Sequence, residues 1–420
     1  SACTRPPGRP SEVPLEEVRS SDVAPGYHSH VPFDWKTRRK FLDLPFPQSE
    51  YDSRLGRVRK AMAEAGVGAL LVFGDQGDSG DLVYLSNFIP FGRAAMVLPL
   101  AGSPQIITDA VLHGEPINSY AWMTWIQEFT AVHHSPAEFA QAISRSLRMQ
   151  GVKKVGLVGL DNIPLPVWRK LEGEIPSWVD FSWELLKIKS VRSPREVALL
   201  REVGRVTAAG MKAAVESVRV GVTESELVGV ASKVLFEQGA HDRAFSTIVN
   251  SGPRSGVKHS YPTKRKIARG DMVYLDMGAT EYGYLSDMSR TVVVGGANET
   301  QLEVLDVVEE AFETLLSMMR PGVRTSRLMA KAEEIAGRSG LRKKYAGRIY
   351  LGLAVHHAIA TSFFEIPSIG LPDTVLKKSM SFAFEPMAHI LDFGTAVIED
   401  CILITGSGAE SLTPYERVHW

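Results

Sequence analysis

The chain has 420 residues, of which 44% are hydrophobic and 23% are charged, and its 47 Lys and Arg nearly balance its 48 Asp and Glu. This length favours two domains, and a net charge of −1 predicts neither a nucleic-acid partner nor an anionic membrane partner. Only Cys3 and Cys401 occur, too few for a disulfide framework, so we expect a reducing, cytoplasmic compartment. No run of 18 apolar residues occurs, and no transmembrane helix is predicted.

The first 48 residues are rich in proline and show no amphipathic periodicity. We expect an extended arm that lies on a surface, either of this chain or of a partner. Four aromatic residues, Tyr27, Phe33, Trp35 and Phe41, favour a docked arm over a free one.

Residues 49 to 185 alternate between helical and strand patterns, which predicts an α/β domain. The expected helices are 51–65 and 136–149. The expected strands are 69–73, 81–88, 94–100, 105–109 and 154–158.

The second domain is expected to cover residues 186 to 420. Ser193, Pro194 and Glu196 predict a helix that opens with a capping box, and Thr223 and Glu226 repeat the pattern. A strand is expected over 244–250, and helices are expected over 302–319 and 326–338.

A predicted hairpin carries the first candidate site residues. Met272–Asp276 is an apolar strand that ends on a carboxylate, and Tyr284–Asp287 is the returning strand, which also ends on an acid. We therefore expect Asp276 and Asp287 to be cross-strand neighbours. Two half-buried like charges repel each other unless a cation lies between them, and carboxylates are hard ligands that suit a divalent ion.

Further candidate ligands follow in order. They are His357, the Glu365-Ile-Pro367 segment, Glu385 before Pro386, and Glu399 before Asp400. With the hairpin, this series resembles the ligand motifs of the pita-bread metallohydrolases, the superfamily of methionine aminopeptidase, prolidase and creatinase. The resemblance covers about residues 51 to 415. It implies a creatinase-like amino-terminal α/β domain followed by a pita-bread catalytic domain.

The resemblance also implies a dinuclear metal site. Asp276, Asp287, His357, Glu385 and Glu399 would hold two divalent cations (Mn, Fe, Co or Zn), with Asp287 and Glu399 as bridges and Glu385 also as the proton shuttle. The weight of carboxylates favours Mn or Fe over Zn. His357 is preferred to His356 because in this superfamily the metal-binding His stands eight residues before the Glu of the Glu-x-Pro segment.

Substrate residues are less regular than the ligands. His259 matches the His-x-x-Pro frame of a substrate-site, catalytic histidine. Elsewhere the chain departs from its peptidase relatives, with Phe364 in place of a His, Val397 in place of an Arg, His389 in place of a Tyr, and Ala358 in place of a Gly. Phe364 and His389 are nevertheless expected to contact the substrate, and the losses favour an unusual one.

The expected activity is hydrolysis of an amide or peptide C–N bond, as in Xaa-Pro aminopeptidases and prolidases, with an altered substrate site. The alternatives are a small-metabolite enzyme similar to ectoine hydrolase or dimethylsulfoniopropionate lyase, and an inactive binding module. Prolidases and creatinases are dimers, so the resemblance also implies a homodimer.

Overall fold

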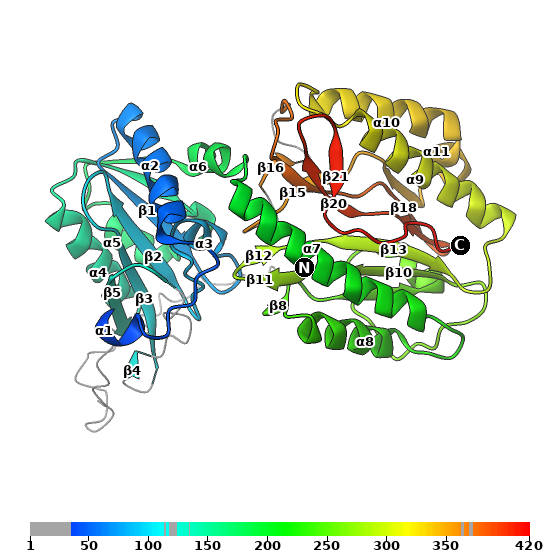
Figure 1. The fold of residues 1–420 in the computed structure, drawn as a ribbon, viewed down its shortest axis with the longest axis horizontal. Coiled ribbons are helices and arrows are strands. Elements are labelled where there is room, and N and C mark those ends of the chain that lie inside the picture. Colours follow the sequence, from blue (N-terminus) through cyan, green and yellow to red (C-terminus); the bar gives the residue numbers. More distant parts are fainter. Residues whose placement is uncertain (1–34, 113–114, 117–123, 134, 363–364, 369–372) are drawn as a thin grey trace, which may run out of the picture.

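The computed structural model describes residues 35–112, 115–116, 124–133, 135–362, 365–368 and 373–420. Two units lie side by side, an amino-terminal one around a single broad sheet and a carboxy-terminal one that carries the hairpin (Figure 1). Most of the expected arm, with Tyr27 and Phe33, lies outside the described residues. Its described part is not wholly extended, because it contains the short helix α1 (Trp35–Arg38). Phe41 is 62% exposed, so this aromatic ring is largely in solvent.

The amino-terminal sheet has seven described strands and is mixed. In spatial order they are β4 (Glu115–Pro116), β3 (Gln105–Leu112), β2 (Ala94–Pro99), β1 (Ala69–Gly74), β6 (Lys154–Val158) and β7 (Ser177–Asp180), while β5 (Glu128–His133) also pairs with β3. The helices and the 3-10 turn of this unit are α2 (Gln48–Glu64), α3 (Gly80–Ser86), α4 (Pro136–Met149), η3 (Leu160–Asn162), α5 (Leu165–Leu171) and α6 (Ser182–Lys189).

The central strand β1 separates two hydrophobic cores, because successive side chains of a strand point to opposite faces. Leu70 packs with Val58 of α2, Leu85 of α3 and Leu185 of α6. Leu71 belongs to the core on the other face, which contains α4 and α5. The unit is therefore a three-layer α/β domain, as the alternating pattern predicted.

One predicted element of this unit is wrong. Residues 81–88 were expected to form a strand, but Gly80–Ser86 is the helix α3. A short apolar run has no clear period, and here both faces of the helix are buried, so the run looks like a buried strand. Asn87 ends the helix in a left-handed conformation, φ 57°, which asparagine tolerates better than most residues.

The carboxy-terminal unit contains five described α-helices and four small sheets. The helices are α7 (Pro194–Ser217), α8 (Glu224–Glu237), α9 (Glu299–Met318), α10 (Thr325–Ser339) and α11 (Leu341–Lys344), with one 3-10 turn, η4 (Gly252–Gly256). The strands are β8 (Asp242–Arg243), β9 (Ile248–Ser251), β10 (Met272–Met277), β11 (Ala279–Glu281), β12 (Tyr284–Leu285), β13 (Met288–Val293), β14 (Ile349–Gly352), β15 (His356–Ala358), β16 (Glu365–Ser368), β17 (Ser381–Phe384), β18 (Met387–Ile390), β19 (Gly394–Val397), β20 (Asp400–Ile404) and β21 (Ala409–Ser411). The strand expected over 244–250 thus begins later, at Ile248.

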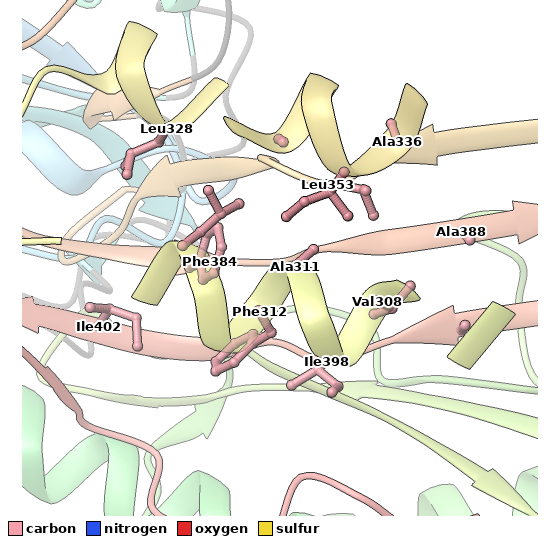
Figure 2. Packing of buried hydrophobic residues seen from close by; sticks show 14 of the residues in the cluster. Val308, Ala311, Phe312, Leu328, Ala336, Leu353, Phe384, Ala388, Ile398 and Ile402 are labelled. Carbon is pink, nitrogen blue, oxygen red and sulfur yellow. The ribbon is translucent and has the colours of Figure 1, made fainter. Parts of the chain in front are cut away.

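Two helix pairs enclose these sheets. The pair α7 and α8 packs on β9, β10 and β13, and α9 and α10 pack on β17, β18 and β20. Figure 2 shows the second core, where Phe312 of α9 and Leu328 of α10 face Phe384 and Ile402 of the strands. The strands that carry the candidate ligands therefore lie between two helical layers.

The junction between the units is built as the sequence predicted. Ser193 and Glu196 form a reciprocal capping box at the start of α7, and Thr223 and Glu226 do the same for α8. The expected boundary after residue 185 falls inside α6, whose Leu185 belongs to the amino-terminal core. Among the described residues, no helix is both long and apolar enough to cross a membrane.

Candidate metal and catalytic site

The hairpin places the first two carboxylates diagonally, not directly opposite each other. β10 pairs antiparallel with β13, and Asp276 lies opposite Ser289. Asp287 immediately precedes β13, two residues before Ser289, so the two aspartates share one face across the pair. The two aspartates are thus cross-strand neighbours as predicted, but the expected returning strand 284–287 is not the partner of β10, because β12 pairs with β11 in a small hairpin of its own. Its turn, Tyr282-Gly283, has positive φ at both residues, as a type I′ turn requires.

The remaining three candidate ligands come from the second half of the unit. His357 lies on β15, Glu385 follows β17, and Glu399 precedes β20. Nε2 of His357 is 3.6 Å from Oδ2 of Asp287. The ligand atoms of Asp287, His357 and Glu399 all lie within 4.8 Å of one another. Five side chains spread over 124 positions of sequence therefore line one cavity of about 510 Å³.

The two adjacent histidines face different surroundings. His357 is the one near Asp287 and Glu399. His356 also reaches the cavity wall, but it is buried against Phe382 with Nδ1 2.8 Å from the carbonyl oxygen of Ala354. Burial lowers the pKa of His356. The geometry thus places His357, the residue chosen from the spacing, in the cluster.

Hydrogen bonds from neighbouring side chains orient the carboxylates. Tyr274 donates to Oδ2 of Asp276 at 2.6 Å, and Ser289 donates to Oε2 of Glu399 at 2.7 Å. The buried guanidinium of Arg290 donates to the carbonyl oxygen of Glu399 at 2.7 Å and to Oδ1 of Asp400 at 2.7 Å. Sequence reasoning did not assign these supporting roles. The position of Tyr274, two before Asp276 on one strand face, is the signal that was available.

The four carboxylates repel one another in a buried site. Burial, followed by the charges of Asp276 and Glu385, raises the pKa of Asp287 well above its usual range. Burial and then the neighbouring carboxylates raise the pKa of Glu399 in the same way. The pKa of Glu385 rises to about 8, mainly through burial and against the opposing effect of Lys258. Such a group of acids is stable in ionised form only with cations between them.

A further observation shows that these ligand atoms suit divalent metal ions. Oδ1 of Asp276 and Oδ1 of Asp287 are buried and have no hydrogen-bond partner among the described residues. A buried carboxylate oxygen without a donor is costly, and a cation would satisfy both atoms. One imidazole and four carboxylates form an oxygen-rich set suited to hard or borderline divalent ions.

The three candidate substrate residues differ in their placement. His259 lines the cavity and lies next to Lys258, which also lines it. His389 is not among the described residues that line the cavity. It is buried, with Nδ1 2.6 Å from Oγ1 of Thr395, and burial lowers its pKa to about 3. Phe364 lies outside the described residues.

Glu365, the acid of the Glu-x-Pro segment, is outside the cavity lining and has a different environment. It is fully buried, 2.6 Å from Nη2 of Arg192 and 3.1 Å from Nζ of Lys189. Lys189 also pairs with Asp81 of α3 at 2.7 Å. This ion-pair cluster connects β16 to the junction and to the amino-terminal unit. Its members come from distant segments of the chain, so no local sequence pattern predicts it.

Two family models match most of the chain. Residues 198–406 match the model of metallopeptidase family M24, and residues 54–192 match that of the creatinase/prolidase N-terminal domain. An Xaa-Pro dipeptidase from Pyrococcus furiosus is 33% identical over 231 residues, which are 55% of this chain and 65% of that protein. The chain therefore aligns with slightly less than two thirds of that relative's length.

Solved structures give the same fold. The crystal structure of a prolidase from Pyrococcus horikoshii has a TM-score of 0.73 and 25% identity, over 87% of this chain and 99% of that one. An X-Pro aminopeptidase from Thermotoga maritima has a TM-score of 0.74 and 23% identity, over 86% and 98% of the two chains. With its creatinase-like first domain, its pita-bread second domain and the matching family models, this chain belongs to the metal-dependent peptidases of family M24.

Proposed function

We propose that this protein hydrolyses the peptide bond of Xaa-Pro dipeptides or of a closely related compact amide. The observation that carries the proposal is the convergence of four carboxylates and one imidazole on a cavity of about 510 Å³, with two carboxylate oxygens buried and unpartnered among the described residues. The similarity to an Xaa-Pro dipeptidase supports the substrate class.

The proposed ligands are Asp276, Asp287, His357, Glu385 and Glu399. Two divalent cations bound there would polarise the substrate carbonyl and would lower the pKa of a bound water molecule to near neutrality. Asp287 and Glu399 lie together with His357 in the cluster, and these two carboxylates are the proposed bridging ligands. Tyr274 and Ser289 hold Asp276 and Glu399 in fixed orientations, which preorganises the site.

Two residues are proposed to act on the substrate directly. Glu385 lines the cavity from the end of β17, and we assign to it the transfer of a proton to the leaving nitrogen. His259 lines the same cavity and has a pKa lowered by burial and by Lys258, so its ring is neutral at neutral pH. A neutral imidazole donates through one nitrogen and accepts through the other, and either suits contact with the substrate amide.

A second candidate function is the hydrolysis, or the lyase-type cleavage, of a small metabolite that is not a peptide. It rests on Val397, which is fully buried with Ile248 and Tyr274, so no guanidinium comes from this position. The test is an assay of the chain reconstituted with Mn, Fe, Co or Zn against Xaa-Pro dipeptides and a panel of small non-peptide metabolites. Turnover of dipeptides supports the first function. Turnover of the metabolites alone replaces it with the second, and no turnover in either panel contradicts both.

We also propose a homodimer in which the amino-terminal arm or the first domain contributes to the interface. The arm has no core of its own, and Phe41 near its described end is largely exposed. Light scattering at micromolar concentration tests this proposal. A dimer mass supports it, and a monomer mass contradicts it.

A further inference from the structure

Lys258 occupies an unusual position in the cavity. Among the described residues that line the cavity, it is the only Lys or Arg. Its side chain is 31% exposed, so it is partly removed from water but still open to the cavity.

The contacts of the Lys258 ammonium are weak ones. Nζ lies 3.9 Å from Oε2 of Glu385, beyond the range of a hydrogen bond. Nζ donates to the sulfur of Met387 at 3.4 Å, and the ring centroid of Tyr350 lies 5.7 Å away. A thioether is a weak acceptor, whereas an ammonium has three donors to satisfy.

The backbone directs this side chain into the cavity. Successive side chains of an extended segment point in opposite directions, yet Lys258 and His259 both line the cavity. His259 has φ 57°, a left-handed conformation that costs free energy for a residue other than glycine. The turn at His259 thus presents two polar side chains to the cavity in succession.

Charge balance indicates what Lys258 binds. The four carboxylates carry four negative charges, which two divalent cations would neutralise. With Glu385 bound to metal, the Lys258 ammonium would keep only the thioether of Met387 and the ring of Tyr350 as contacts. A partly buried cation favours a ligand with one negative charge.

We propose that Lys258 is a specificity-determining residue that binds the free carboxylate of the substrate. This inference rests on the proposed function and sharpens it, because it selects substrates whose carboxylate closely follows the scissile amide. Dipeptides meet this condition. Longer peptides and carboxamides do not.

The test is the binding of matched ligands to the metal-reconstituted full-length protein. Equilibrium titration compares proline with prolinamide and leucine with leucinamide, in wild type and in Lys258→Met. We expect wild type to bind each acid about 10- to 100-fold more tightly than its amide, the usual value of a charge-assisted hydrogen bond. Lys258→Met should remove most of this preference, and Lys258→Arg should retain part of it.

The control is Lys343→Met, which removes an exposed lysine of α11 away from the cavity and should preserve the preference. The inference is overturned if wild type binds acids no better than amides, or if Lys258→Met keeps the preference because metal alone binds the carboxylate. Hydrolysis is measured separately on Ala-Pro and its carboxamide. If neither compound is cleaved, the proposed function is rejected. The ratio of acid binding to amide binding still decides the role of Lys258.

Discussion

The hydroxyl of Tyr274 donates a 2.6 Å hydrogen bond to Oδ2 of Asp276, while Oδ1 of the same carboxylate is buried without a hydrogen-bond partner among the described residues. One oxygen is therefore fixed by the protein, and the other is available to a cation. Because Tyr274 and Asp276 lie on the same face of β10, the strand itself sets this geometry.

Tyr274→Phe should weaken metal binding by about 10- to 100-fold, the usual effect of losing a hydrogen bond to a ligand. Titration against a competing chelator measures this change. The control is Tyr284→Phe, which removes a buried hydroxyl that donates instead to Glu196, at 3.1 Å, outside the cavity lining. Equal metal affinity in Tyr274→Phe and wild type would show that the hydrogen bond does not support a metal ligand.

The adjacent histidines allow a sharp comparison. His357→Ala should abolish tight binding at one metal position, because its Nε2 lies beside Asp287. His356→Ala should retain the metal, although loss of packing against Phe382 lowers stability. Metal content shows which histidine is the ligand, and circular dichroism shows whether each variant is folded. The reverse result, with metal lost only in His356→Ala, would assign the ligand to the other histidine.

The buried ion pairs of Glu365 predict a dependence of stability on pH. Burial alone would raise its pKa, but Arg192 and Lys189 outweigh burial and lower it from 4.5 to about 2. Since the folded pKa is below the unfolded one, the stabilisation is present above about pH 4.5 and is lost as pH falls toward 2. Urea unfolding at pH 7 and pH 3 should show this loss in wild type and less of it in Glu365→Gln.

Glu365→Gln should also lower the free energy of unfolding at pH 7 by about 3–5 kcal/mol, because it leaves two buried cations undercompensated. Glu410→Gln is the matched control. It breaks an exposed pair with Arg201, for which a loss of at most about 1 kcal/mol is expected. Similar losses in the two variants would contradict a special role for the buried cluster.

Phe364 tests the altered substrate site, although it lies outside the described residues. A peptidase benefits from an imidazole at this position, worth about 2–4 kcal/mol by analogy with other oxyanion donors. We expect wild type to cleave Xaa-Pro dipeptides more weakly than a compact amide, and Phe364→His to cleave the dipeptides faster and the compact amide more slowly. Steady-state kinetics provide the measurement. Wild-type kcat/KM at or above about 10⁴ M⁻¹ s⁻¹ would contradict the altered substrate site.

The sequence predicted local features more reliably than contacts between distant segments. The capping boxes at Ser193 and Thr223 were predictable because all their partners lie within three residues. The helix α3 was predicted as a strand because hydrophobic periodicity does not distinguish a helix from a strand when every face is buried. Similarly, the diagonal placement of Asp287 depends on an intervening hairpin, and the pairing of Glu365 with Arg192 depends on a fold that joins residues far apart in the chain.

The candidate ligands were predictable only through motifs in order, because no local pattern joins Asp276 to Glu399. The exclusion of His389 from the cavity was not predictable, since it depends on which side of β18 faces Thr395. Lys258 also escaped prediction, because only the left-handed backbone at His259 turns two successive side chains into the cavity.

Metal stoichiometry tests the central claim most directly. The full-length protein is stripped with chelator, reconstituted separately with Mn, Fe, Co and Zn, and analysed for bound metal per chain. We expect up to two ions per chain in wild type, a marked loss of metal and of activity in Asp287→Ala, and no change in Asp306→Ala, which alters an exposed aspartate of α9. Absence of bound metal in wild type under all four conditions, or full metal content in Asp287→Ala, would contradict the account.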